Sequence, residues 1–138
     1  MLPSTKVDLN HNKIMRVEAL DELATVLFPG NRNHQRIFVA VFVELKWAEG
    51  QFLTALEPVA LKYGFSHRSL ETVRAKMRRL GIIDHVSRFN KKHGYREGWT
   101  YSNRCVQSLI ALATLTESLR ERKGPSQEQK ERDLHRYL

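Results

Sequence analysis

The segment from Ser66 to Ile83 constrains this chain most, because it predicts one helix with a defined start and stop. The hydroxyl of Ser66 can accept a hydrogen bond from a first-turn backbone N–H, and Gly81 supplies a left-handed stop. Apolar side chains recur at 3-4-3 spacing and form one stripe: Leu70, Val73, Met77 and Leu80. The opposite face carries Arg68, Glu71, Thr72, Ala75 and Arg79, with Arg78 beside it. Such a helix packs its stripe on a core and presents cations outward. A solvated surface helix without a partner explains this segment alone equally well.

The positive charge of the chain is concentrated in one region. Between Lys62 and Arg104 there are 11 Lys and Arg against 3 acidic residues, so this third of the chain carries the whole net charge of +8. Concentrated positive charge predicts a polyanionic partner, either nucleic acid or an anionic membrane. No apolar run is long enough to span a bilayer, so we expect no membrane partner of that kind.

The first half of the chain predicts an arm followed by three helices. Residues 1–12 are polar and irregular, and an amphipathic helix is expected over 13–28. Residues 34–49 have the β-branched content of a strand, but the long apolar run with polar flanks favours a helix, the most buried of the set, which Asn33 can cap. An extended piece is expected over 51–54. The next helix has Pro58 in its first turn. Thr54 or Glu57 is its expected cap, and Val59, Ala60 and Tyr63 are expected to face inward.

The second half predicts a steep helix crossing and a hairpin. Only Gly64 and Phe65 separate the third helix from the cap at Ser66, and helices joined by so short a turn cross steeply, as in a helix-turn-helix. After Gly81 the period changes to that of a strand over 82–89, with a basic loop at 90–98 and a returning strand at 99–101. A long helix is expected from Ser102 or Asn103 to about Arg122, where Gly124-Pro125 breaks it. Residues 126–138 are either disordered or a short helix opened by Ser126.

Two segments resemble the signatures of the winged helix-turn-helix family. They are Val59-Ala60-x-x-Tyr63-Gly64-Phe65-Ser66 and Val73-x-x-x-Met77-x-x-Leu80-Gly81-Ile82-Ile83. The resemblance covers residues 34–120 and assigns no subfamily. Pro58 and the long wing depart from the family pattern. It implies a mainly α fold with a small β-hairpin, a winged helix-turn-helix with an extra N-terminal helix and a long C-terminal helix. The expected division is an arm and helix at 1–33, the winged domain at 34–101, a C-terminal helix at 102–123 and a charged tail at 124–138.

The resemblance also implies sequence-specific binding of double-stranded DNA, with helix 66–80 in the major groove and wing 88–98 on the backbone or in the adjacent minor groove. A transcriptional regulator is the expected function. Arg68, Ser69 and Thr72 lie in the half of the helix that reaches base edges. Arg78 and Arg79 are better placed for phosphates. The wing adds the remaining expected DNA contacts, which are Arg88, Lys91, Lys92 and Arg96.

Helix 102–122 has a wide apolar stripe and is the expected homodimer element, which would place two recognition helices about 34 Å apart. The alternative is that this stripe packs on the first helix of the same chain. A small-molecule effector pocket between the first and last helices stays an open alternative, and no residue pattern names an effector.

Two other functions remain open from the residues. Tyr95 lies between cations at the hairpin tip, and exposed aromatic side chains stack on unpaired bases, so a module for single-stranded nucleic acid or RNA is one alternative. A winged-helix protein-interaction module in a replication or transcription assembly is the other.

We expect no enzyme activity, no metal and no cofactor. The six histidines show no ligand spacing, and no nucleophile motif or Gly-rich phosphate loop is present. One cysteine, Cys105, excludes an internal disulfide and fits a reducing cytoplasm. Its expected place is the core, with a lowered thiol pKa at the helix start as the alternative.

Overall fold

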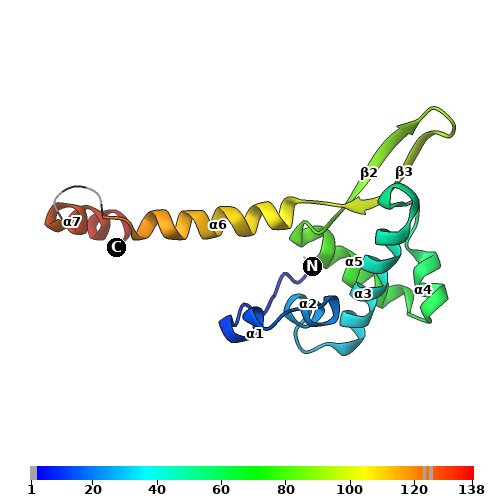
Figure 1. Cartoon of the computed structure of the whole chain (residues 1–138), viewed down its shortest axis with the longest axis horizontal. Helices are drawn as coiled ribbons and strands as arrows, with labels where there is room; N and C mark the ends of the chain where they lie inside the picture. The colour runs from blue at the N-terminus through cyan, green and yellow to red at the C-terminus, as the bar shows by residue number, and fades with distance from the viewer. Residues whose placement is uncertain (1–2, 123, 125) are drawn as a thin grey trace. The chain divides into compact units, whose positions relative to one another are not determined.

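The computed structural model describes residues 3–122, 124 and 126–138 (Figure 1). Its internal contacts divide the chain into residues 1–105 and residues 106–138. The fold class expected from the sequence, mainly α with a small β-hairpin, is confirmed. The elements of the first unit are α1 His11–Met15, α2 Leu20–Leu27, α3 Arg32–Trp47, a short 3-10 turn Glu49–Gln51, β1 Phe52–Leu53, α4 Glu57–Tyr63, α5 His67–Leu80, β2 Ile83–Asn90 and β3 Gly94–Tyr101.

The α3 helix is the centre of the core. Its side chains at Ile37, Phe38, Val41 and Leu45 are all 0 % exposed, and their spacing is that of one helix face. The α2, α4 and α5 helices pack around it, and α5 contributes the fully buried Leu70, Val73 and Met77. The choice of helix over strand for this segment is therefore correct. Its predicted cap is wrong, because the side chain of Asn31, not Asn33, accepts from His34 N–H at 3.0 Å.

The predicted helix over 13–28 is wrong, since the chain forms α1 and α2 with a break between them. No residue of α1 is buried, so this helix gains little from packing. The ammonium of Lys13 reaches back to Thr25 O (3.1 Å) and to Asp8 (3.0 Å), which ties α1 to the side of α2. A straight continuation of α2 would not allow that contact.

The tight turn between α4 and α5 is built on Gly64. Its φ of +73° ends α4, and Phe65 N–H closes the turn on Ala60 O at 2.9 Å. Ser66 then caps α5 by accepting from Ser69 N–H at 3.1 Å, as expected. Two predictions for α4 are wrong. Its N-cap is Leu56, which makes no side-chain cap bond, and Tyr63 is exposed.

The hairpin is longer than predicted. The predicted loop 90–98 is wrong, because β2 and β3 pair in register from Ile83–Tyr101 out to Asn90–Gly94, leaving only a short turn at 91–93. β1 adds a third antiparallel strand on the other side of β3, in the order β1-β3-β2. Figure 1 shows the outer part of the hairpin extending beyond the helices of this unit.

The second unit contains α7 (Ser126–Tyr137) and most of α6 (Arg104–Arg120). The predicted long helix and the helical alternative for the tail are thus correct, whereas the predicted break at Pro125 involves a residue outside the described part of the chain. The large apolar side chains of α6 are 52–64 % exposed: Val106, Leu109, Ile110, Leu112, Leu115 and Leu119. Among the described helices, none is long and apolar enough to cross a membrane.

Gly81 allows the close return of the chain after β3. A Cβ on Gly81 would lie 2.7 Å from Arg104 Cβ and 2.8 Å from Cys105 N, and its φ is +85°. Gly64 has a similar φ of +73° with open space around it.

We expect Gly64→Ala to lower the free energy of unfolding by about 1 kcal/mol from backbone strain, and Gly81→Ala by about 3 kcal/mol because overpacking is added. Urea denaturation of both variants measures the difference, and equal losses would contradict the close approach.

Candidate nucleic-acid interface

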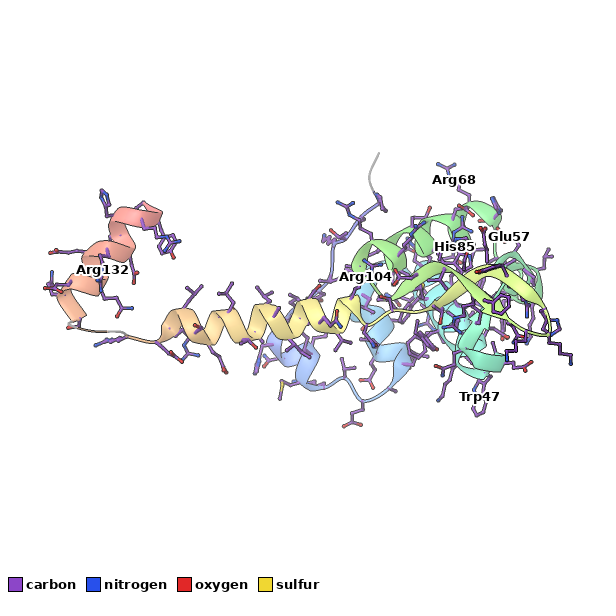
Figure 2. All side chains as sticks on the ribbon, turned by 90° about the horizontal axis from the view of Figure 1, so that it is seen from above. Trp47, Glu57, Arg68, His85, Arg104 and Arg132 are labelled. Atoms are coloured by element: carbon purple, nitrogen blue, oxygen red, sulfur yellow. The ribbon has the colours of Figure 1, made fainter. Side chains whose placement is uncertain are left out.

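The outward face of α5 carries the predicted base-reading residues. Arg68 is exposed at the first turn, and Figure 2 shows its side chain projecting away from the helix. Thr72 is exposed one turn later, and its hydroxyl donates to Arg68 O at 3.0 Å. Ser69 is half-buried, and its hydroxyl accepts from the Asn33 side-chain amide at 3.3 Å. Both hydroxyls therefore already have a partner, which leaves Arg68 as the exposed cation among the three predicted base-reading residues.

An open groove of about 980 Å³ lies between α5 and the hairpin. The indole of Trp99 lies at its wall, 8 % exposed, with the guanidinium groups of Arg74 and Arg78 at 5.1 Å and 5.9 Å from its ring. The ring of His85 meets the indole edge-on at 4.8 Å. Cation–π contacts of this kind hold both guanidinium groups in place along the groove.

Only some cations of this groove are available to a partner. Arg74 is ion-paired with Glu71 and lies 3.7 Å from the Glu57 carboxylate. Arg104 is paired with Asp84, and its hydrogen bond holds the pKa of that carboxyl below its ordinary value. In the described part of the chain, Arg78 and Arg79 form no ion pair, so the positive charge of the groove comes mainly from them.

The cations of the hairpin divide between its tip and one of its faces. Arg88 and Arg96 are directly opposite each other in the register, and their guanidinium groups lie 5.2 Å and 5.8 Å from the ring of Phe52 on β1. Arg88 also donates to Gly50 O and to the Thr100 hydroxyl, each at 3.1 Å. Arg88 is therefore a structural tie between the hairpin and the body, which weakens its predicted role on phosphates.

The remaining two predicted wing cations, Lys91 and Lys92, lie in the exposed turn at the hairpin tip. Neither forms an ion pair with a described residue. They are the wing cations best placed to meet a phosphate.

The N-terminal arm is held by a contact that no local pattern predicts. Lys76 on α5 is 7 % exposed, and its ammonium donates to Lys6 O at 2.5 Å and lies 4.6 Å from the ring of Phe28. Burial, and then the charge of Lys6, lower the pKa of Lys76. Pro3 lines the groove together with Ala75 and Arg79, so the arm runs beside α5. Lys76 therefore holds the arm and is not available for phosphates.

One group of possible metal ligands joins α4 and α5. Atoms of Glu57, His67 and Glu71 lie within 4.8 Å of one another, and the four-residue spacing of His67 and Glu71 is a ligand spacing that the histidine pattern alone does not reveal. The guanidinium of Arg74 contacts both carboxylates and supplies positive charge there. The group is therefore explained as an ion-pair network.

Cys105 is half-buried, and burial raises the pKa of its thiol. The expected alternative of a lowered thiol pKa at a helix start is wrong. The thiol is consequently a weak nucleophile at neutral pH.

Lys76→Met is expected to release the arm without unfolding the domain. Methionine keeps the length of the apolar stem but removes the ammonium that donates to Lys6 O. Asp8 N–H bonds to Val26 O at 2.8 Å and reports on the arm. We expect its hydrogen exchange to become about tenfold faster, because hydrogen bonds to charged groups contribute about 1.5 kcal/mol. Lys6→Met keeps the accepting carbonyl and serves as the control with unchanged exchange. Equal exchange in both variants would contradict this role.

Comparison with known proteins gives no match: no family model fits the chain, and neither a curated protein nor a solved structure matches it.

Proposed function

We propose that this chain is a cytoplasmic, sequence-specific protein that binds double-stranded DNA, with α5 in the major groove and the hairpin tip on the backbone, and that it regulates transcription. The observation that carries the proposal is the location of the accessible cations. Arg68, Arg78 and Arg79 lie on the exposed side of α5, and Lys91 and Lys92 lie at the end of the neighbouring hairpin. A solvated face without a partner would not require both elements to carry the excess charge.

The dimensions and chemistry of α5 suit this role. The helix has 14 residues, and the major groove of B-DNA admits one α-helix. Arg68, in the first turn, can pair bidentately with guanine, and the small Ala75 permits close approach of the helix to the DNA. Arg78 and Arg79, in the last turn, are suited to phosphates, which position the protein without reading sequence.

Dimerisation through α6 forms part of the proposal. Residues 105–116 contain no charged side chain, and the six large apolar side chains of α6 are more than half exposed. A helix that is apolar over most of its surface is stable in water only when that surface is covered. Specific interfaces bury at least about 1,200 Å² in total, so each copy would have to cover roughly 600 Å² of its partner.

Binding of single-stranded nucleic acid is the second candidate, and one observation favours it. Phe89 and Tyr95 on the hairpin are 62 % and 79 % exposed, and exposed aromatic rings near cations stack on unpaired bases. A single strand would need no insertion of α5 into a groove. The two candidates therefore differ in their dependence on Arg68 and Arg79.

A fluorescence-anisotropy titration of random-sequence duplex DNA over a range of salt concentrations tests the DNA proposal. About six phosphate contacts predict that the logarithm of the affinity falls with the logarithm of salt with a slope near −5. We expect Arg68→Ala/Arg79→Ala to weaken duplex binding roughly 10- to 100-fold, and Lys91→Ala/Lys92→Ala to reduce the slope by about 2. Arg16→Ala/Lys46→Ala removes two exposed cations elsewhere and is the matched control. Binding indifferent to both interface pairs, or confined to single strands, would contradict the proposal.

The dimer proposal predicts that a charge in the apolar stripe of α6 separates the copies. Sedimentation equilibrium of the wild-type chain is expected to give twice the monomer mass of 16.1 kDa. Leu112→Glu should give the monomer, because an unpaired carboxylate would be buried in the interface. Thr114→Glu adds the same charge on the opposite side of α6 and should remain dimeric. A wild-type monomer at high concentration would exclude the proposal.

A further inference from the structure

Two aromatic side chains form an exposed rung near the end of the hairpin. Phe89 and Tyr95 are directly opposite in the register, with ring centroids 5.1 Å apart and ring planes tilted by 58°. Apart from this mutual contact they are largely in solvent, at 62 % and 79 % exposed. Leaving two large rings in water forgoes the burial that such side chains ordinarily gain in a core. Their position therefore suggests that a partner covers them.

The rung is on the hairpin face that continues from α5. Side chains alternate between the faces of a strand, so the rung shares its face with the pair His85–Trp99, whose indole contacts α5. The intervening pair is Ser87–Glu97, which carries one carboxylate. Phe89 is four residues beyond His85, or about 13 Å further along the strand. A partner that meets the exposed side of α5 thus also meets the aromatic rung.

The surroundings of the rung favour a polyanion as that partner. Lys91, Lys92 and His93 form the adjacent turn, and no acidic residue lies between Phe89 and Arg96. Rings bordered by cations suit the stacked bases of a nucleic acid, whose apolar faces lie between two rows of phosphates. An acidic protein or an anionic membrane would satisfy the cations but offers no stack of flat rings.

We propose that Phe89 and Tyr95 form an aromatic wedge that enters the minor groove beside the α5 site, unstacks one base-pair step and kinks the duplex. This inference rests on the proposed DNA binding and specifies how the wing takes part in it. The minor groove, about 6 Å wide, does not admit a two-stranded ribbon, so the side chains enter while the strands stay outside. Tyr95, the more exposed ring, leads.

The wedge gives the wing a preference for sequence without a hydrogen bond to a base. Apolar wedges in the minor groove kink DNA by about 20–90° towards the major groove. Pyrimidine–purine steps such as TA unstack more readily than other steps, whereas A-tracts are stiff. We therefore expect the site to have a flexible step on the wing side of the α5 contact.

The test uses a duplex of about 24 base pairs with central TA steps, with 2-aminopurine in place of one central adenine and a donor–acceptor pair at its ends. Wild-type protein is expected to raise the 2-aminopurine fluorescence, which reports unstacking, and to shorten the end-to-end distance. Phe89→Thr/Tyr95→Thr keeps strand-favouring residues and should abolish both signals and weaken binding roughly tenfold, with the salt slope unchanged. Phe89→Tyr/Tyr95→Phe keeps both rings and should behave as wild type.

The outcomes separate the wedge from DNA binding itself. Salt-dependent duplex binding without a fluorescence change or kink, or equal signals in wild type and Phe89→Thr/Tyr95→Thr, would overturn the wedge and leave the proposed function standing. Absence of duplex binding at every salt concentration would remove both. A fluorescence signal seen only with a single-stranded oligonucleotide would overturn the wedge in favour of single-stranded nucleic acid. If Phe89→Thr/Tyr95→Thr instead loses binding only to anionic phosphatidylserine vesicles, the wedge is overturned in favour of a membrane surface. Signals that are equal on an A-tract duplex would overturn the preference for flexible steps.

Discussion

The packing of α5 on α3 is the interaction on which the rest of the structure depends. Leu70, Val73 and Met77 are fully buried against a helix whose own inner face is fully buried. Because a helix has only one face opposite its buried stripe, this contact fixes which side chains of α5 point outward. It also fixes the start of β2, since Ile83, only two residues beyond the Gly81 stop, is itself in the core. The groove and the hairpin both follow from that orientation.

Periodicity predicted α3 and α5 well, because side chains three or four residues apart lie on one helix face and are buried together. Local sequence identified the α5 stripe, the Gly64 turn and the Ser66 cap, all of which depend on residues close in sequence. It failed where a contact joins distant segments. Nothing local to Arg88 indicates that Phe52 and Gly50 hold it, and nothing local to Lys76 indicates a bond to Lys6, 70 positions away. The hairpin was predicted too short because its outer strands are rich in charge and glycine, while cross-strand pairing extends them.

Counting cations in the sequence overestimates the charge that a partner can meet. Of the basic residues between Lys62 and Arg104, Lys62, Arg74 and Arg104 are paired with carboxylates, and Lys76 is buried. Composition cannot distinguish a guanidinium that holds two elements together from one that extends into solvent. Arg88 and Arg68 show the difference, since the first is bonded to Gly50 O and Thr100 and the second projects from the start of α5 (Figure 2).

The two faces of the hairpin make different contacts, because side chains alternate between the faces along a strand. On one face Phe52 lies against Arg88 and Arg96, which connects the hairpin to the body and reduces the repulsion of two guanidinium groups directly opposite each other. That attachment allows the outer part of the other face, at Phe89 and Tyr95, to remain uncovered without loss of the strands. Exposed rings on a mobile loop would lose much of their contact energy to ordering on binding. Rings on a paired and anchored ribbon are ordered in advance, so the tie at Arg88 would lower the ordering cost of the proposed DNA binding.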